Sequence, residues 1–227
     1  MKAIILAAGR GNRLAPVTNH LPKALIPLKD GKTILDFQIE NLSNFISLKD
    51  ILVVVGYKKE LIQRAHPELI YVYNERYSVT NTSKSLLLGI NGIEDDILWL
   101  NGDVVFDKEI IPKLLKAGQS CVLVDKKSCG EEEVKYSLDE EGYIKEISKE
   151  VKNAEGEALG INFVAKKDLP IFKKHLHLVE DNDYFEKAIE NMIIQDGVKI
   201  LPIDKGDLFC EEIDFIKDLE KVKNYLG

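Results

Sequence analysis

Near the N-terminus, glycines and basic side chains are spaced as a phosphate-binding loop would require. Gly9 and Gly11 allow the backbone to approach a ligand closely and to adopt positive φ angles. Consecutive backbone N–H groups in such a loop form an anion-binding concavity. Arg10 and Arg13 add guanidinium forks suited to phosphate oxygens, and Lys23 adds a compact positive charge. These residues predict a site for a phosphorylated ligand, the alternative being an ordinary strand-end turn with solvated basic side chains.

Three acidic residues further along the chain could hold a divalent cation. Asp103 comes just after the apolar run 97–100, and a carboxylate at the end of a strand can bind Mg²⁺. In an extended segment Glu212 and Asp214 project on the same side, because strand side chains alternate. Together the three carboxylates predict a magnesium site. Asp103 could instead stabilise a turn, and 211–214 could be a solvated acidic turn in which Asp214 caps the last helix.

Short apolar runs and helical patterns alternate along the chain and must position these side chains. Strands are predicted at 3–7, 50–56, 69–73, 97–100, 120–124 and 199–203, and helices at 34–45, 61–65, 82–90, 110–117, 183–194 and 215–226. The β-α order up to residue 125 predicts an α/β fold with a mostly parallel sheet flanked by helices. Such sheets bind ligands at the carboxyl ends of their strands, here in the loops 8–23, 56–58 and 101–103.

The stretch 126–166 has a different pattern. Short strands are predicted at 134–138, 143–147 and 160–164, joined by turns, which indicates a small β-rich insertion. No linker or internal repeat divides the chain, so residues 1–227 are predicted to form a single domain.

Composition limits the partners that this chain could have. Its 227 residues include 31 Lys and Arg against 38 Asp and Glu, a formal net charge of −7, which argues against duplex nucleic acid. No apolar run approaches the length of a membrane span. The three cysteines have no paired spacing, so a reducing, cytoplasmic location is expected. We therefore expect small-molecule partners, with no nucleic acid and no membrane.

Residues 6–14 (LAAGRGNRL), followed by Pro22 and Lys23, resemble the signature of nucleotidyltransferases that join a nucleoside triphosphate to a phosphorylated small molecule. The resemblance continues through Asp103 to the C-terminal acidic segment and implies a Rossmann-like nucleotidyltransferase fold. The segment 77–86 (YSVTNTSKSL) is similar to bacterial choline-phosphate and aminoalkylphosphonate cytidylyltransferases, whereas sugar-1-phosphate enzymes usually have a glycine-rich pattern there. The chain is therefore expected to be a cytidylyltransferase.

The resemblance also implies which residues bind which group. The nucleotide would be bound by the half 1–125 and the acceptor by the half 126–227. The implied nucleotide-binding residues are Leu6, Ala7, Ala8, Gly9, Arg10, Gly11, Asn12, Arg13, Lys23, Asn81, Ser85 and Asp103. The implied catalytic residues are Arg13, Lys23 and Asp103, the implied Mg²⁺ ligands are Asp103, Glu212 and Asp214, and the implied acceptor-binding residues are Lys23, Tyr184 and Glu186.

The implied reaction is a Mg²⁺-dependent attack by an acceptor phosphate or phosphonate oxygen on the α-phosphorus of CTP, with pyrophosphate leaving. Asn81 and Ser85 would lie near the nucleobase, where amide and hydroxyl groups suit a pyrimidine edge, or could only cap the next helix.

Several identities stay open at this point. Ala188 and Ile189 stand where an aromatic cage for choline would be expected, which leaves another amine-bearing phosphate or phosphonate, or a polyol phosphate, as the acceptor. The alternative functions are a sugar-1-phosphate nucleotidyltransferase using UTP, GTP or dTTP, and a non-catalytic nucleotide-binding module. The protein is expected to act alone or as a homo-oligomer.

Overall fold

The apolar residues at the N-terminus form β1 (Lys2–Ala7), the strand around which the sheet is built. The computed structural model describes residues 1–127 and 129–227. In it, β1 lies between β2 (Ile51–Val55) and β4 (Ile97–Asn101) and runs parallel to both. The side chains of β1 alternate between two buried faces of the sheet, which explains why its apolar run is not interrupted by polar residues.

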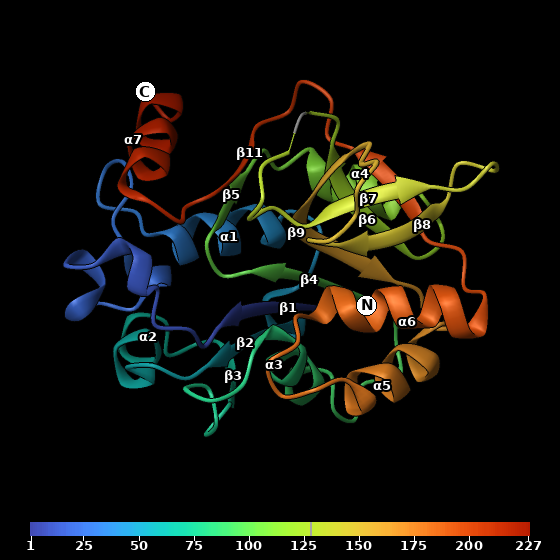
Figure 1. The fold of residues 1–227 in the computed structure, drawn as a ribbon. Helices are drawn as coiled ribbons and strands as arrows, with labels where there is room; N and C mark the ends of the chain where they lie inside the picture. The colour runs from blue at the N-terminus through green and yellow to red at the C-terminus, as the bar shows by residue number, and fades with distance from the viewer. Residues whose placement is uncertain (128) are drawn as a thin grey trace.

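The described residues place nine strands in one sheet and pair two short strands beside it (Figure 1). The further strands are β3 (Ile70–Tyr73), β5 (Val104–Phe106), β6 (Cys121–Asp125), β7 (Lys135–Leu138), β8 (Ile144–Ser148), β9 (Gly156–Val164), β10 (Leu201–Asp204) and β11 (Cys210–Glu212). The order across the sheet is β10-β6-β9-β4-β1-β2-β3, with β7 and β8 attached at β9. The strands from β4 through β1 and β2 to β3 are parallel, whereas β9 runs antiparallel to both of its neighbours, β4 and β6.

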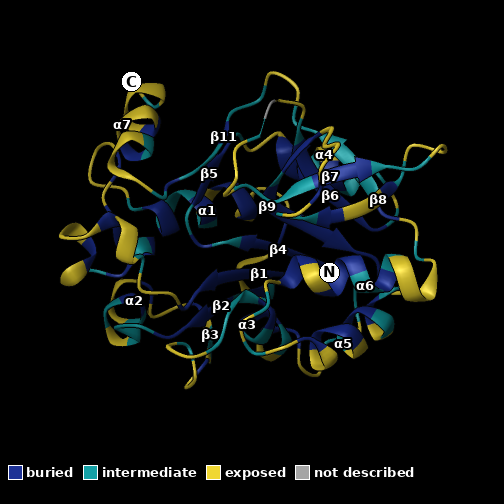
Figure 2. Cartoon of the chain, in the orientation of Figure 1, coloured by how far each residue is buried: buried dark blue, intermediate teal, exposed yellow. Residues whose placement is uncertain are grey.

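Helices cover both faces of this sheet (Figure 1), and their buried sides are turned toward it (Figure 2). They are α1 (Ile34–Ser43), α2 (Lys59–Ala65), α3 (Thr82–Gly89), α4 (Ile110–Leu115), α5 (Leu169–Leu178), α6 (Phe185–Asp196) and α7 (Ile216–Tyr225). Residues of α1, α2 and α4 join the core on one face, and residues of α3, α5 and α6 join the core on the other. The α7 helix packs on a third apolar cluster, which includes Leu14 and Val105. The predicted α/β class is confirmed.

Aromatic packing holds the start of α6 against the sheet. Trp99 of β4 is fully buried, and its ring stacks on Phe172 of α5 with a centroid distance of 5.1 Å. Phe185, the first residue of α6, meets the Trp99 ring edge-on at 5.4 Å. Such aromatic pairs contribute about 1 kcal/mol beyond the area they bury. The residues on either side of Phe185, Tyr184 and Glu186, are thereby held in a defined position.

The stretch 126–166 differs from its prediction as a separate β-rich insertion. Its last strand, β9, is a central strand of the main sheet, and β7 with β8 forms a hairpin attached to it; residue 128 lies outside the described residues. Gly160 has a φ of +64° and lies where the pairing with β6 shifts register between Val122 and Val124. A β-bulge adds an extra residue and interrupts the regular alternation of side chains along the strand. The sequence pattern therefore does not reveal the full nine residues of β9.

Three elements carried no sequence prediction: α5, β5 and β11. The α5 helix has Pro170 in its first turn, where proline favours a helix start, so a signal was available in the sequence. The strands β5 and β11 have three residues each, too few for a pattern to be recognised. They pair antiparallel, with Glu212 opposite Val104, and this pairing brings the acidic C-terminal segment beside Asp103.

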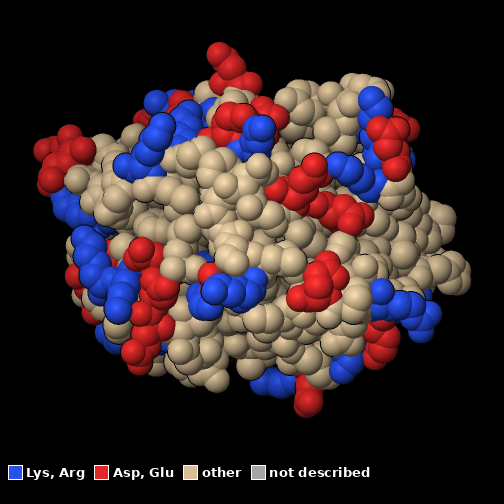
Figure 3. All heavy atoms as spheres, turned by 180° about the vertical axis from the view of Figure 1, so that it is seen from behind, with Lys and Arg blue, Asp and Glu red and all other residues tan. Residues whose placement is uncertain are grey.

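Charged side chains are scattered over one face of the protein (Figure 3). On the face drawn in Figure 3, basic and acidic side chains are interspersed in small groups separated by uncharged residues. That face therefore has mixed charge, unlike a surface that binds a nucleic-acid backbone. Among the residues described, no helix has the length and apolarity needed to cross a membrane.

Replacing Gly160 by alanine should destabilise the protein, because the added Cβ atom would crowd Glu212 and Asn101. A Cβ atom at this position would overlap Glu212 Oε1 and lie 2.7 Å from Asn101 Nδ2. The left-handed backbone conformation adds strain for any residue with a side chain. We expect Gly160→Ala to lower the free energy of unfolding by about 3 kcal/mol, measured by chemical denaturation.

Gly142→Ala is the matched control for this substitution. Gly142 also has a positive φ, +84°, but an added Cβ would find no atom within 4 Å. Gly142→Ala should lower the free energy of unfolding only by the cost of the backbone strain, about 1 kcal/mol. If both variants lost the same amount, crowding against Glu212 and Asn101 would have no energetic effect and the prediction would be wrong.

Candidate active site

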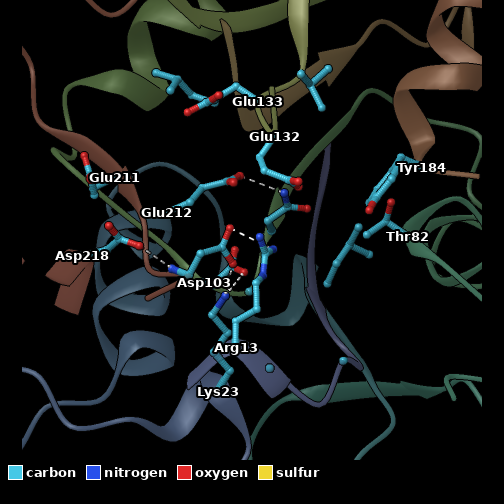
Figure 4. Close-up of a pocket in the computed structure, with 18 of the residues that line it drawn as sticks. Arg13, Lys23, Thr82, Asp103, Glu132, Glu133, Tyr184, Glu211, Glu212 and Asp218 are labelled. Atoms are coloured by element: carbon cyan, nitrogen blue, oxygen red, sulfur yellow. Dashed lines mark hydrogen bonds and ion pairs between the residues drawn. The ribbon is translucent and has the colours of Figure 1, made fainter. Parts of the chain in front are cut away.

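A cavity of about 550 Å³ opens where β1 and β4 end, at the sheet edge that the β-α order predicted. Its lining comes from segments far apart in the chain. They are the loop after β1, the start of α3, the turn 101–103, the loop before β7, the start of α6 and the segment 210–218. In Figure 4, Arg13 and Lys23 rise from one side toward Asp103, while Glu132, Glu133 and Tyr184 lie on the far side.

The glycine-rich loop after β1 is held in a fixed shape. Gly11 has a φ of +65°, and a Cβ there would be 3.1 Å from Lys23 Cβ, so this position requires glycine. The Thr18 hydroxyl donates a hydrogen bond to the Gly11 carbonyl at 2.8 Å. A short 3₁₀ turn (Asn12–Leu14) follows, and its Leu14 side chain is fully buried. The loop therefore presents Arg13 at the mouth of the cavity.

Backbone and side-chain hydrogen bonds fix the turn that carries Asp103. The Gly102 amide donates to the Leu6 carbonyl at 2.9 Å, and the Ile213 amide donates to the Asp103 carbonyl at 3.1 Å. The buried Gln38 amide of α1 donates to the carbonyls of Asn101 and Val104 at 2.9 and 2.8 Å. Three elements thus determine where the Asp103 carboxylate lies.

Two cations hold two carboxylates together at the base of the cavity. Lys23 Nζ lies 2.6 Å from Asp103 Oδ2 and 2.9 Å from Asp214 Oδ1. The Arg13 guanidinium lies 3.0 Å from the other oxygen of Asp214. Burial alone would lower the pKa of Lys23, but Asp103 and Asp214 outweigh it and raise that pKa, so the ammonium stays charged. The structure therefore brings these four predicted site residues together.

Glu212 adds a third carboxylate beside this pair. Its side chain accepts a hydrogen bond from Asn101 Nδ2 at 3.0 Å. Burial, followed by repulsion from Asp103 and Asp214, raises the pKa of Glu212 well above its usual value. Such a raised pKa is typical of acidic groups that share a site with other negative charges.

The predicted magnesium site is not assembled in this arrangement. Among residues 1–127 and 129–227, no three carboxylates already surround a common point as a metal cage would require. The Lys23 ammonium instead pairs with both Asp103 and Asp214. Two buried oxygens at the same place, Asp103 Oδ1 and Asn101 Oδ1, have no hydrogen-bond partner within the described part of the chain. Oxygen donors of this kind are the ligands that a hard cation such as Mg²⁺ takes.

Most of the predicted nucleotide-binding residues line the cavity, and three do not. Leu6, Ala7, Gly9, Gly11, Asn12, Arg13, Lys23, Asn81 and Asp103 are at its wall. Ala8 is buried and uses its carbonyl to accept the Tyr57 amide at 3.0 Å. Arg10 is exposed, with its guanidinium 5.4 Å from the centroid of the Tyr57 ring. These two residues and Ser85 are the predicted nucleotide-binding residues that lie outside the cavity wall.

Asn81 and Ser85 have different surroundings, although both lie near the start of α3. The Asn81 side chain caps α3 by accepting from the Thr82 amide at 2.8 Å and donates to the Asn182 carbonyl at 3.1 Å. Ser85 is buried, and its hydroxyl accepts a hydrogen bond from Asn74 Nδ2 at 3.0 Å. The capping role is therefore present at Asn81, and Ser85 supports the fold away from the cavity.

Sequence reasoning missed several lining residues on the far side. Lys127 precedes β7, where the pattern indicated only a loop. Thr82 lines the cavity next to Asn81, and Glu157 lies at the start of β9. No motif marks these residues, because they come to the cavity through the β7–β8 hairpin and β9.

The predicted acceptor-binding residues Tyr184 and Glu186 both line the cavity. Tyr184 is nearly half exposed, and Glu186 is only 7% exposed. Burial raises the pKa of Glu186 to about 7. A carboxyl group in this state changes charge near neutral pH and responds strongly to any charge placed beside it.

Comparison with known proteins gives a consistent family assignment. The profile of the MobA-like NTP transferase domain matches residues 3–159. The CTP:phosphoglutamine cytidylyltransferase of Campylobacter jejuni is 27% identical over an alignment that covers 97% of this chain and 98% of that protein. The bifunctional protein GlmU of Methanococcus maripaludis is 41% identical over 113 residues, which are 48% of this chain and 26% of GlmU. The chain thus spans about a quarter of the length of that curated relative.

The fold is shared with a solved structure as well. The inositol-1-phosphate CTP transferase from T. maritima superposes with a TM-score of 0.79, covering 98% of this chain and 96% of that one at 21% identity. The TM-score shows that the two chains share the same fold, and the low sequence identity supports no statement beyond the fold.

Removing Lys23 should strengthen binding of a divalent cation to the protein without nucleotide. Lys23 occupies the space between Asp103 and Asp214, and its loss leaves their negative charges uncompensated. We expect Lys23→Ala to bind Mn²⁺, a paramagnetic substitute for Mg²⁺, about tenfold more tightly or better, since one unit charge at ion-pair distance is removed. Electron paramagnetic resonance titration of free Mn²⁺ measures this directly.

Lys217→Ala provides the control, because Lys217 also lines the cavity but lies over the Phe215 ring, 5.5 Å from its centroid. This variant should bind Mn²⁺ as the wild-type protein does. Unchanged or weaker Mn²⁺ binding by Lys23→Ala would mean that Asp103 and Asp214 do not form a cation site.

Proposed function

The chain belongs to the MobA-like NTP transferase domain family, and from this premise we propose that it transfers a cytidylyl group from CTP to a small phosphorylated or phosphonate acceptor, releasing pyrophosphate. The observation that carries the proposal is the meeting of Arg13, Lys23 and Asp103 in a cavity at the carboxyl edge of a parallel sheet. The cavity has basic groups for two anionic substrates and carboxylates for a cation that would accompany them.

In the proposed reaction an oxygen of the acceptor attacks the α-phosphorus of CTP. The new bond joins that oxygen to the α-phosphorus, and the bond to the bridging oxygen of the pyrophosphate breaks. The attacking oxygen is already ionised, so no base is needed and catalysis consists of positioning and charge neutralisation. The loop 9–13 would cradle the triphosphate, and Arg13 would neutralise the departing pyrophosphate. Lys23 would bridge the acceptor and the α-phosphate.

Asp103, Glu212 and Asp214, with the amide oxygen of Asn101, are the residues that would hold Mg²⁺. The ion would supply positive charge to phosphate oxygens that become more negative in the transition state. The free oxygens of Asp103 and Asn101 support this assignment. Arg13 and Lys23 are paired with carboxylates that would turn to the metal, so the phosphates of the substrates are suitable new partners for both basic side chains.

Two observations favour CTP among the nucleotides. The segment 77–86 resembles that of cytidylyltransferases, and Asn81 within it lines the cavity. The relative from Campylobacter jejuni that aligns with nearly the whole chain is named for the same nucleotide. An amide side chain can both donate to and accept from the edge of a pyrimidine.

A pyrophosphate-release assay tests this function. With Mg²⁺ present, CTP, UTP, GTP, ATP and dTTP are each combined with phosphocholine, phosphoethanolamine, 2-aminoethylphosphonate, polyol phosphates and hexose 1-phosphates. We expect turnover with CTP and a non-sugar acceptor. Turnover with a hexose 1-phosphate and another nucleotide would place the protein among the sugar-1-phosphate enzymes, and nucleotide binding without any turnover would contradict catalysis.

Substitutions at the base of the cavity should abolish most of the activity. Asp103→Asn and Lys23→Ala should each lower kcat by on the order of 100-fold or more, because the first weakens binding of the cation and the second removes a positive charge beside the transferred phosphate. Lys223→Ala, an exposed position on α7, should keep the wild-type rate and serves as the control. A variant that kept kcat within a few-fold would remove its residue from the catalytic set.

A further inference from the structure

The start of α7 presents an aromatic ring at the wall of the cavity. Phe215 is the residue immediately before α7, and it lines the cavity while 43% of its surface stays exposed to solvent. Single exposed apolar residues are common on protein surfaces, so exposure by itself assigns no role to this ring. Its contacts do, because they are made with charged side chains of the site.

Two positive side chains lie at the Phe215 ring. The guanidinium carbon of Arg13 is 5.5 Å from the ring centroid, and the ammonium nitrogen of Lys217 is 5.5 Å from the same centroid. A cation within about 6 Å of an aromatic centroid is attracted by the negative charge of the ring face. Both cations also line the cavity. The ring is therefore an electrostatic partner for positive charge at this wall.

The chain around Phe215 is fixed, so the ring cannot drift away from Arg13. The Phe215 amide donates a hydrogen bond to Asp218 Oδ2 at 2.7 Å. Ile213 is fully buried in the same apolar cluster as Leu14, the neighbour of Arg13. The packing of this cluster therefore holds Arg13 and Phe215 side by side, although they are about 200 residues apart in the chain.

Arg13 has a second partner, Asp214, and the two contacts differ in kind. The ion pair with Asp214 Oδ2, at 3.0 Å, uses guanidinium N–H donors, which are the groups that a phosphate would also need. The attraction to the Phe215 ring depends on the charge and not on a particular N–H donor, so it can persist while the N–H groups turn to phosphate oxygens. The Arg13 side chain is also 53% exposed, and exposed ion pairs hold a side chain only weakly.

Resting on the proposed function, we infer that Phe215 is a positioning residue that keeps Arg13 directed at the phosphates of the bound nucleotide. Entering phosphate groups compete with Asp214 for the N–H donors of Arg13, and the ion pair is then lost. The ring contact remains and limits the conformations that the long Arg13 side chain can adopt. Less conformational entropy is lost when a side chain restricted in this way binds its ligand.

A double-mutant cycle between Arg13 and Phe215 tests the inference without requiring turnover. Isothermal titration calorimetry measures binding of pyrophosphate with Mg²⁺ to the wild-type protein, Phe215→Leu, Arg13→Ala and the double variant. Leucine keeps an apolar side chain at this position but has no aromatic ring. We expect Phe215→Leu to weaken binding about fivefold in the wild-type background, the effect of one partly exposed cation–π contact. It should have no effect once Arg13 is replaced.

The same cycle is run on kcat/KM for CTP in the pyrophosphate-release assay. Phe215→Leu should lower kcat/KM about fivefold in the wild-type background, and the double variant should match Arg13→Ala. A purely structural role would instead give the same loss in both backgrounds. Thermal unfolding shows whether each variant is folded.

Two variants serve as controls. Phe215→Tyr keeps an aromatic ring and should bind pyrophosphate as the wild-type protein does. Ile216→Ala removes the next side chain, which is also 43% exposed but lies outside the cavity wall. This variant should leave both pyrophosphate binding and kcat/KM for CTP unchanged.

The outcomes separate the inference from the function on which it rests. Equal binding by the wild-type protein and Phe215→Leu, or an equal loss in Phe215→Tyr, overturns the role of the ring. A loss that persists in the Arg13→Ala background shows that the ring acts through Lys217 or the fold, and it also overturns the inference. Failure of the wild-type protein to bind pyrophosphate does the same. Coupled binding without turnover of any acceptor contradicts the proposed function, while the positioning of Arg13 stands.

Discussion

The mutual neutralisation of charges at the base of the cavity is the constraint on which the site depends. Asp103 and Asp214 could not lie so close to each other and to the half-buried Glu212 without compensating positive charge. Lys23 supplies most of it by bridging both aspartates, and Arg13 takes the second oxygen of Asp214. Because burial opposes the charged forms of Lys23 and Glu212, the Lys23 ammonium is stable only while Asp103 and Asp214 lie beside it. The cluster is therefore well suited to exchange partners when phosphate groups arrive.

The fold provides the rigid frame that this charge cluster needs. The turn after β4 approaches the backbone of β1 so closely that a Cβ on Gly102 would lie 2.6 Å from the Leu6 carbonyl oxygen. The short pairing of β5 with β11 then carries the C-terminal acids to the same edge. The apolar cluster beneath α7, which contains Leu14 and Ile213, anchors both the glycine-rich loop and the acidic segment. Packing at one place thus positions both the basic and the acidic side chains.

The two ends of the cavity differ in charge, and this difference limits what can bind across it. Lys23 and Arg13 are near the end formed by the loop after β1, whereas Glu132, Glu133 and Glu186 line the other end. A ligand that spans the cavity complements the charges of both ends only if it carries negative charge at one end and positive charge at the other.

Local patterns in the sequence determined the first half of the fold and the glycine-rich loop after β1. The buried parallel strands β1, β2 and β4 are unbroken apolar runs, and Gly11 marks a backbone conformation that glycine alone adopts without strain. These features depend on neighbouring residues in the chain, so they can be recognised in it. The acid that follows β4 was recognisable for the same reason, because the sheet places strand ends at one edge.

Only the tertiary structure decided how distant segments meet. The antiparallel insertion of β9 between β4 and β6 depends on a bulge at Gly160, and the burial of Ser85 depends on its contact with Asn74. The sequence identified Asp103, Glu212 and Asp214 as acidic, but the position of Lys23 between two of them is a contact across as many as 191 residues. The spacing of apolar residues along the chain indicates which side chains face a core. It does not indicate which distant segment of the chain those side chains contact. Charge pairing across such separations is therefore settled by packing.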